Sequence, residues 1–314
     1  MGTYLLALFD KQAEQEANLA EIATIEAAKL KDPTQMPLYE LYQEDHILTH
    51  DAIDNLISTD TVSYDTDSLP RYVKNAEIPP QPKEGYAMVA LVIDDLGVMP
   101  HLSERTVREL PSEVTLAFLP YGKATYELSE LSRKHGHEVM IHLPMEAMAP
   151  PSKTTPNPGP KALMVDDGLE TIKQNTMLNL EGLANISVGV NNHMGSRFTS
   201  WEDGMQEVLK IVSNEGLLFL DSVTTKDSKV IAAAQKVNIP LLRRNVFLDH
   251  SKEKEDILQA LKKLERIAHQ NGSAIAIGHP YAETLEVLNE WIPLLDKAKI
   301  QLVPITALLN KPKA

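Results

Sequence analysis

The chain has 314 residues, of which 43% are hydrophobic and 24% charged, and its formal net charge is −14. A chain this acidic lacks the Lys/Arg stripe that binding to a phosphate backbone requires, so nucleic acid is excluded as an expected partner. The absence of cysteine excludes disulfides, thiolate zinc ligands and cysteine nucleophiles. A metal site in this chain therefore has to use histidine and carboxylate ligands.

The first 84 residues form an acidic segment that contains 16 acidic and 6 basic side chains. Residues 12–30 carry apolar side chains near helical spacing, and the proline-rich stretch 78–83 is typical of a stiff linker. We therefore predict an acidic, partly helical N-terminal extension and linker over 1–84, followed by a folded domain over 85–314. No segment reaches the roughly 20 apolar residues that span a bilayer, so no transmembrane helix is expected. The apolar run 4–9 is either the remainder of an N-terminal anchor or the buried start of a helix.

From residue 86 onward, short apolar runs alternate with helical patterns. The runs cover 88–93, 114–119, 139–141, 186–190, 217–220, 241–248, 273–277 and 300–305. Between them, apolar residues recur at helical spacing, as over 169–183, 205–212 and 257–268. This alternation predicts a parallel sheet that is buried on both faces. We predict an α/β fold, a distorted (β/α) barrel of seven or eight parallel strands, with a doubly wound open sheet as the alternative.

Polar residues follow the ends of these apolar runs. They are Asp94, Asp95, His142, Glu146, His193, Asp221, Asp249, His250 and His279. In a parallel barrel the carboxyl ends of all strands meet at one face, so these side chains are expected to converge there. A single histidine at a strand end is more often a hydrogen-bonded loop residue, whereas acids and imidazoles that gather at one face are typical of a metal site. The sequence therefore predicts a metal site at the rim of the barrel.

Two segments beside these residues have the composition of ligand-binding loops. Residues 191–198 combine amides, an imidazole, a glycine and a guanidinium, and Asn192 and Arg197 are the candidates for substrate contact. The alternative for this segment is a simple Asn/Gly turn. Residues 144–160 contain six prolines and little periodicity, and irregular loops of this length are usually functional or mobile. We expect this loop to form one side of the groove that contains the site.

With these blocks assembled, the chain resembles the divergent polysaccharide deacetylase family of bacterial envelope proteins, which is related to metal-dependent carbohydrate esterases. The resemblance covers residues 70–310 and rests on four blocks in order, VIDDLG at 92–97, HLPME at 142–146, NNHMGS at 191–196 and GHP at 278–280. It implies a distorted (β/α) barrel that holds one divalent metal ion, with zinc the expected ion. It also implies a place in the periplasm or cell envelope of a bacterium.

The resemblance implies roles for the strand-end residues. Asp94 would be the catalytic base, Asp95 and His142 would be metal ligands, and His279 would be the general acid. The implied activity is hydrolysis of the C–N amide bond of acetamido sugars, which removes N-acetyl groups from a cell-wall or chitin-like glycan.

The third metal ligand is open at this point, because the related esterases have a second histidine where this chain has Glu146. Either Glu146 binds the metal or His193 does. We favour His193, since two histidines and a carboxylate are a common catalytic zinc set. Asp221 is a further candidate, either as a ligand or as a partner that orients a histidine.

Two other functions compete with deacetylation. A catalytically weak or inactive glycan-binding envelope protein could keep the same fold, although the retained Asp94 and His279 argue against it. A different metal hydrolase, acting on a phosphoester or a peptide-like amide, also fits the fold, since fold alone does not determine function.

Overall fold

The computed structural model describes residues 69–149 and 156–310, and Leu69–Leu309 form one compact unit. The expected helical segment 12–30 and the apolar run 4–9 lie outside the described residues, so the division at residue 84 stays a prediction. None of the helices in the described ranges combines the length and the apolar composition that a membrane crossing requires.

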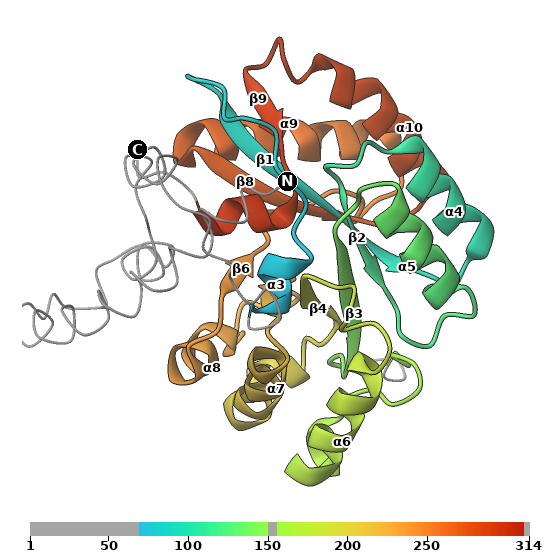
Figure 1. The fold of residues 1–314 in the computed structure, drawn as a ribbon, viewed down its shortest axis with the longest axis vertical. Helices are drawn as coiled ribbons and strands as arrows, with labels where there is room; N and C mark the ends of the chain where they lie inside the picture. Colours follow the sequence, from blue (N-terminus) through green and yellow to red (C-terminus); the bar gives the residue numbers. More distant parts are fainter. Residues whose placement is uncertain (1–68, 150–155, 311–314) are drawn as a thin grey trace, which may run out of the picture. The chain divides into compact units, whose positions relative to one another are not determined.

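The described unit alternates strands with helices, as the sequence predicts (Figure 1). The strands are β1 (Ala87–Leu96), β2 (Thr115–Phe118), β3 (Val139–Met145), β4 (Gly189–Met194), β5 (Leu218–Asp221), β6 (Leu241–Arg243), β7 (Val246–Phe247), β8 (Ser273–Gly278) and β9 (Ile300–Leu302). The α-helices are α3 (Arg71–Lys74), α4 (Pro100–Glu109), α5 (Thr125–Lys134), α6 (Leu169–Leu180), α7 (Glu202–Asn214), α8 (Val230–Val237), α9 (Lys254–Asn271) and α10 (Ala282–Trp291). The helical patterns over 169–183, 205–212 and 257–268 correspond to α6, α7 and α9.

The strands pair in one parallel sheet with the order β6-β5-β4-β3-β2-β1-β8-β7, and β9 pairs with the start of β1. Strands β6 and β7 stand at the two ends of this order, yet only Arg244 and Asn245 separate them in the chain. Two residues span less than about 11 Å between the flanking strands, so the sheet has to curl until its ends are neighbours. No ladder joins β6 to β7 in the described part of the chain. The predicted distorted (β/α) barrel is confirmed as a curled, incompletely closed parallel sheet, and the expected single run 241–248 is divided at this opening.

Strand alternation separates the core into an outer and an inner layer. On β1, Leu91 and Ile93 pack in the outer layer, which includes buried side chains of α4, α9 and α10. The alternate residues Ala90 and Val92 pack in the inner layer with apolar side chains of β2, β3, β5 and β8. Since the residues of both layers are almost fully buried, a Leu or Ile side chain here contributes about 1.5–3 kcal/mol to the stability of the fold. The next inward position on β1 after Val92 is Asp94, which places a carboxylate at the carboxyl end of the filled interior.

Candidate metal centre

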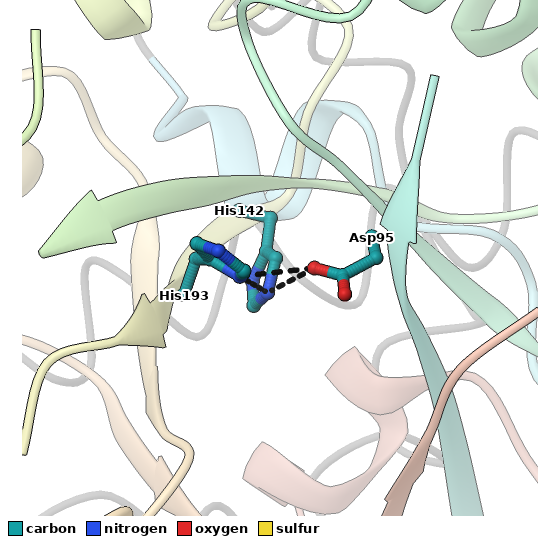
Figure 2. Close-up of side chains that lie close together, drawn as sticks. All are labelled: Asp95, His142 and His193. Carbon is teal, nitrogen blue, oxygen red and sulfur yellow. Dashed lines mark hydrogen bonds and ion pairs between the residues drawn. The ribbon is translucent and has the colours of Figure 1, made fainter. Parts of the chain in front are cut away.

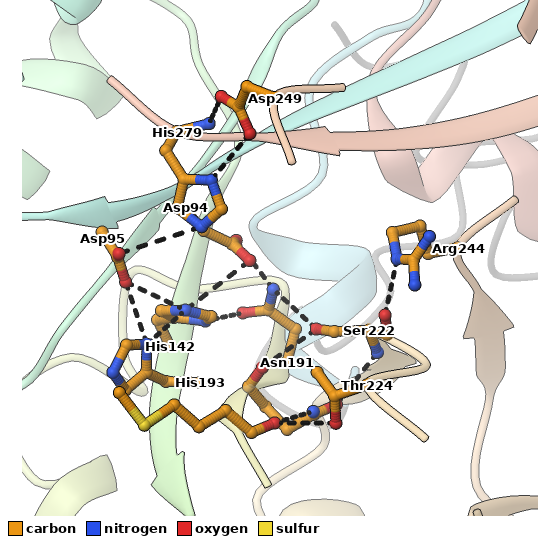
Figure 3. Close-up of polar contacts among 12 residues, drawn as sticks. Asp94, Asp95, His142, Asn191, His193, Ser222, Thr224, Arg244, Asp249 and His279 are labelled. Carbon is orange, nitrogen blue, oxygen red and sulfur yellow. Dashed lines mark hydrogen bonds and ion pairs between the residues drawn. The ribbon is translucent and has the colours of Figure 1, made fainter. Parts of the chain in front are cut away.

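The end of β1 presents two adjacent carboxylates to the same cleft. Asp94 points inward by strand alternation and is 2% exposed. In a regular strand Asp95 would point the other way, but its φ of 60° lies in the left-handed region, which a residue with a side chain rarely adopts. As a result both carboxylates reach Nε2 of His142, at 3.6 Å from Oδ2 of Asp94 and 3.3 Å from Oδ1 of Asp95 (Figure 3). Such strain persists where the surrounding structure holds it, and it is concentrated at functional sites.

Three donor atoms from different strands meet beside this turn. Nδ1 of His193 on β4 lies 2.9 Å from Oδ1 of Asp95 and 3.1 Å from Nε2 of His142 on β3 (Figure 2). Tetrahedral zinc with bonds of about 2.0–2.1 Å holds its ligand atoms about 3.3 Å apart. The measured separations are close to this value. Asp95, His142 and His193 therefore form a cluster that can hold a metal ion.

The electrostatics of the cluster also fit a cation. Oδ1 of Asp95 is buried and, within the described part of the chain, makes no hydrogen bond of normal geometry, although two imidazoles lie close to it. Burial by itself would raise the pKa of Asp95, but the close approach of His142 and His193 holds it well below its ordinary value. Burial likewise opposes a charge on His142, yet Asp94 and Asp95 raise the pKa of its imidazole. The cluster thus favours a positive charge at the point where the three ligands converge.

His279 reaches the same cluster from the end of β8. Its Nδ1 lies 2.9 Å from Oδ1 of Asp249, and Oδ2 of Asp249 accepts hydrogen bonds from the backbone N of His279 at 2.6 Å and from Oγ1 of Thr284 at 2.8 Å. With Nδ1 held in this way, Nε2 is directed towards Oδ2 of Asp95, 3.8 Å away (Figure 3). Burial would lower the pKa of His279, but the hydrogen bond to Asp249 and the charges of Asp249, Asp94 and Asp95 raise it to about 8.

Comparison with known proteins identifies the family. A model of the divergent polysaccharide deacetylase family matches residues 91–309. The chain belongs to this family. It is 38% identical over 227 residues to the uncharacterized protein YibQ of Escherichia coli K12, an alignment that covers 72% of this chain and 68% of YibQ. It is 30% identical over 222 residues to an uncharacterized protein of Haemophilus influenzae Rd, with coverage of 68% and 74%.

Two solved structures have a similar fold. An uncharacterized protein from Agrobacterium tumefaciens C58 superposes with a TM-score of 0.72 at 29% identity, covering 78% of this chain and 97% of the other. A putative cellobiose-phosphate cleavage protein from Enterococcus faecalis V583 superposes with a TM-score of 0.51 at 15% identity, covering 71% and 99%, and this likeness concerns the fold alone. The function of this family member has to be argued from its own site.

The remaining candidate carboxylates, Glu146 and Asp221, have partners outside the cluster. Glu146 forms an ion pair with Arg197 and accepts a hydrogen bond from the backbone N of Val165 at 2.8 Å. Asp221 accepts hydrogen bonds from the backbone N of Val223, from Ser228 and from Arg243. Among the described residues, neither carboxylate belongs to the group of donor atoms around Asp95. His193, the ligand favoured from the sequence, is the residue that joins Asp95 and His142.

The two residues expected to contact substrate lie in different surroundings. The side chain of Arg197 is 41% exposed and pairs with Glu146 and Asp166, so its guanidinium is at the surface but already carries two acidic partners. Asn192 is buried, and its amide accepts a hydrogen bond from the backbone N of Ser222 at 2.9 Å and donates one to the carbonyl of Met194 at 2.7 Å. Substrate contact by Asn192 and Arg197 stays a prediction.

Two residues of the site were given no role from the sequence. Asp249 anchors His279, and Asn191 lies between Asp94 and His142. Strand alternation could have found Asn191, because residues 191 and 193 of β4 share one face and residue 192 faces the other way. Asp249 stands at a strand end like the other residues, but only the tertiary structure shows that it points at His279.

Two aromatic rings lie close to the imidazole of His279. Its ring centroid lies 5.2 Å from that of Phe247 and 5.5 Å from that of Tyr281, and Nζ of Lys252 lies 3.7 Å from the Tyr281 centroid. These rings restrict the orientation of the imidazole and shield it from water.

The loop 144–160, which is expected to form one side of the site, is described except for residues 150–155. The hydroxyl of Tyr121, which follows β2, donates a hydrogen bond to the carbonyl of Pro158 in this loop.

Proposed function

We propose that this protein is a metal-dependent hydrolase that removes N-acetyl groups from a cell-wall or chitin-like glycan. One observation carries the proposal. In a chain of the divergent polysaccharide deacetylase family, the three expected ligands Asp95, His142 and His193 converge beside two further groups suited to proton transfer, Asp94 and His279. A pure binding site has no need of a base and a proton donor beside its metal ligands.

The ion proposed for this site is zinc, held by Asp95, His142 and His193. Two neutral imidazoles and one carboxylate are a common catalytic zinc set, and the donor separations fit it. When bound, the ion would polarise the acetyl carbonyl and lower the pKa of a water molecule. A zinc site with three protein ligands leaves room for this chemistry, whereas four protein ligands are typical of structural zinc.

Asp94 is the proposed base. Its carboxylate is buried, lies beside the ligands without belonging to the cluster of donor atoms, and is oriented by a hydrogen bond from Asn191 at 2.8 Å. Burial raises the pKa of Asp94, and the charges of His142 and His279 offset this only in part. A carboxylate whose proton affinity is raised in this way is a better acceptor for the proton of an attacking water.

His279 is the proposed acid. Asp249 holds its Nδ1–H, so Nε2 is the nitrogen that faces the cleft and can deliver a proton to the departing amine. The buried carboxylate of Asp249 also stabilises the imidazolium form. The two proton-transfer groups come from neighbouring strands, with Asp94 on β1 and His279 directly after β8, and Ile93 and Gly278 just before them are paired in register.

We further propose that the protein acts in the periplasm or cell envelope of a bacterium. The support is chemical: a cell-wall glycan is found there, and the chain has no cysteine to be oxidised. Fractionation of the native host followed by detection with an antibody would test this location.

Acetate release tests the activity. The protein would be stripped with a chelator, reloaded with one equivalent of zinc and incubated with chito-oligosaccharides or purified peptidoglycan. We expect acetate release that disappears without zinc and in the Asp94→Asn variant, and that is unchanged in Asp256→Asn, a matched substitution of an exposed aspartate on α9. Tight zinc binding without acetate release from any acetylated glycan would refute the proposed hydrolase activity and favour the alternative of an inactive glycan-binding protein.

A further inference from the structure

Asn191 occupies the contact point between the proposed base and a metal ligand. Its Cα is paired in register with that of His142 across β3 and β4, so the two side chains lie next to each other on the inner face. Nδ1 of His142 lies 2.9 Å from Oδ1 of Asn191, and Nδ2 of Asn191 lies 2.8 Å from Oδ1 of Asp94 and 3.5 Å from Oγ of Ser222 (Figure 3). The side chain is fully buried, so water does not compete for these contacts.

These contacts allow only one orientation of the amide. The carboxylate oxygen of Asp94 needs a donor, which the NH₂ group of Asn191 supplies. If the amide were turned over, its oxygen would face the Asp94 oxygen and its NH₂ group would face Nδ1 of His142. That arrangement places two acceptors against each other in a site that excludes water, which costs about 1–3 kcal/mol for an unsatisfied buried group.

The orientation of the amide in turn determines the tautomer of His142. With Oδ1 of Asn191 as the acceptor, Nδ1 of His142 has to carry the hydrogen, and the lone pair is left on Nε2. Nε2 is the atom that faces Asp95 and His193. A turned amide would leave the hydrogen on Nε2, where it would block metal binding.

We propose that Asn191 is a positioning residue that couples the base to the metal site. It holds the Asp94 carboxylate in place with its NH₂ group and selects the metal-binding tautomer of His142 with its carbonyl oxygen. The metal part of this inference rests on the proposed zinc site, whereas neither part depends on the identity of the glycan. Partners of this kind, which hold the second nitrogen of a ligating histidine, typically change metal affinity by about 10–100-fold when they are removed.

Two substitutions separate the two contacts. Asn191→Ala removes both, so we expect zinc affinity, measured by competition with a chromophoric chelator, to fall about 10–100-fold. Asn191→Asp keeps an acceptor for Nδ1 of His142 but sets a carboxylate against Asp94. It should bind zinc within a few-fold of the parent and lose most of its acetate release.

The matched control is Asn179→Ala, since Asn179 is also a buried amide with two hydrogen bonds but lies on α6, with its bonds to Lys161 and Asn175. We expect Asn179→Ala to bind zinc with the parental affinity. A fall in its zinc affinity would show that lost stability alone weakens metal binding. Circular dichroism and thermal melts would establish that each variant is folded.

Nuclear magnetic resonance of the metal-free, ¹⁵N-labelled protein, recorded at a pH at which His142 is neutral, reads the tautomer directly. We expect the hydrogen on Nδ1 of His142 in the parent and in Asn191→Asp, and a mixture of the two tautomers in Asn191→Ala. A folded Asn191→Ala protein with parental zinc affinity and the parental His142 pattern would overturn the inference. Because zinc binding and the tautomer are measured without turnover, absence of acetate release from the parent would count against the proposed function and leave this test intact.

Discussion

Replacing Glu138 by Gln should remove a strong pH dependence from the stability of this protein. Glu138 stands at the start of β3, at the opposite end of the strand from the metal cluster, and its side chain is fully buried. Its carboxylate accepts hydrogen bonds from the hydroxyl and the backbone N of Thr306, and from the backbone N of Glu77 at 3.1 Å. The charged groups nearby are the guanidinium of Arg133 and the Glu77 carboxylate, which form an ion pair at 3.0 Å.

The magnitude follows from the two protonation equilibria. Burial raises the pKa of Glu138 from 4.5 to about 7, although the hydrogen bonds from Thr306 and Glu77 and the charge of Arg133 act in the opposite direction. Between these two values the folded protein binds more protons than the unfolded chain, so stability falls as pH rises. The contribution is fully present below the unfolded pKa and is lost as pH rises through the folded pKa. At about 1.4 kcal/mol per pKa unit the total is about 3 kcal/mol, most of it between pH 5 and pH 8.

Urea unfolding of the parent and of Glu138→Gln at a series of pH values measures this contribution. At each pH, the unfolding free energy of the variant is subtracted from that of the parent. This difference isolates the titration of Glu138, because the histidines and other carboxylates are common to both proteins. We expect this difference in unfolding free energy to fall by about 2–3 kcal/mol between pH 5 and pH 8. Glu127→Gln, an exposed substitution on α5, should show no such trend. A difference that stays flat from pH 5 to pH 8 would refute the reasoning.

The remaining predictions concern a metal ligand, the proposed acid and the core. Zinc at 100 times its dissociation constant should stabilise the parent by about 2.7 kcal/mol in urea melts, and His142→Ala should lose this effect; equal stabilisation of both proteins would contradict the ligand role. His279→Ala should lower acetate release by about 10²–10⁴-fold with unchanged zinc affinity, and a folded, zinc-loaded variant with the parental rate would rule out the acid. Phe219→Ala removes a fully buried ring from β5 and should reduce the unfolding free energy by about 3–5 kcal/mol; a loss under about 1 kcal/mol would mean that the site collapses around the cavity.

The fold class could be predicted because apolar runs and helical spacing are local properties of the chain. A strand that is buried on both faces needs an apolar residue at every position, and the runs at 88–93 and 273–277 became β1 and β8. The division of 241–248 could not be read in the same way, since Arg243 and Arg244 interrupt it without showing where the sheet opens. That depends on how far the whole sheet curls.

The candidate site was predicted in part for a related reason. Parallel strands direct their carboxyl ends to one face, so the sequence is sufficient to group residues such as Asp95 and His142. Even the preference for His193 over Glu146 came from the chemistry of zinc ligands. The partner of Glu146 is Arg197, a contact that sequence patterns do not encode.

Residue types and their strand-end positions were thus determined by the sequence alone, whereas the direction of each side chain was decided by the tertiary structure. Asp95 faces the cleft because its backbone is left-handed, and Asn191 rather than Asn192 joins the site because of its place in the pleat. The physical reason is that a hydrogen bond or a metal site forms only when the distances between its atoms are correct to within tenths of an ångström. Positions along the chain specify which strand a residue belongs to, but only the packed sheet sets the distances between strands.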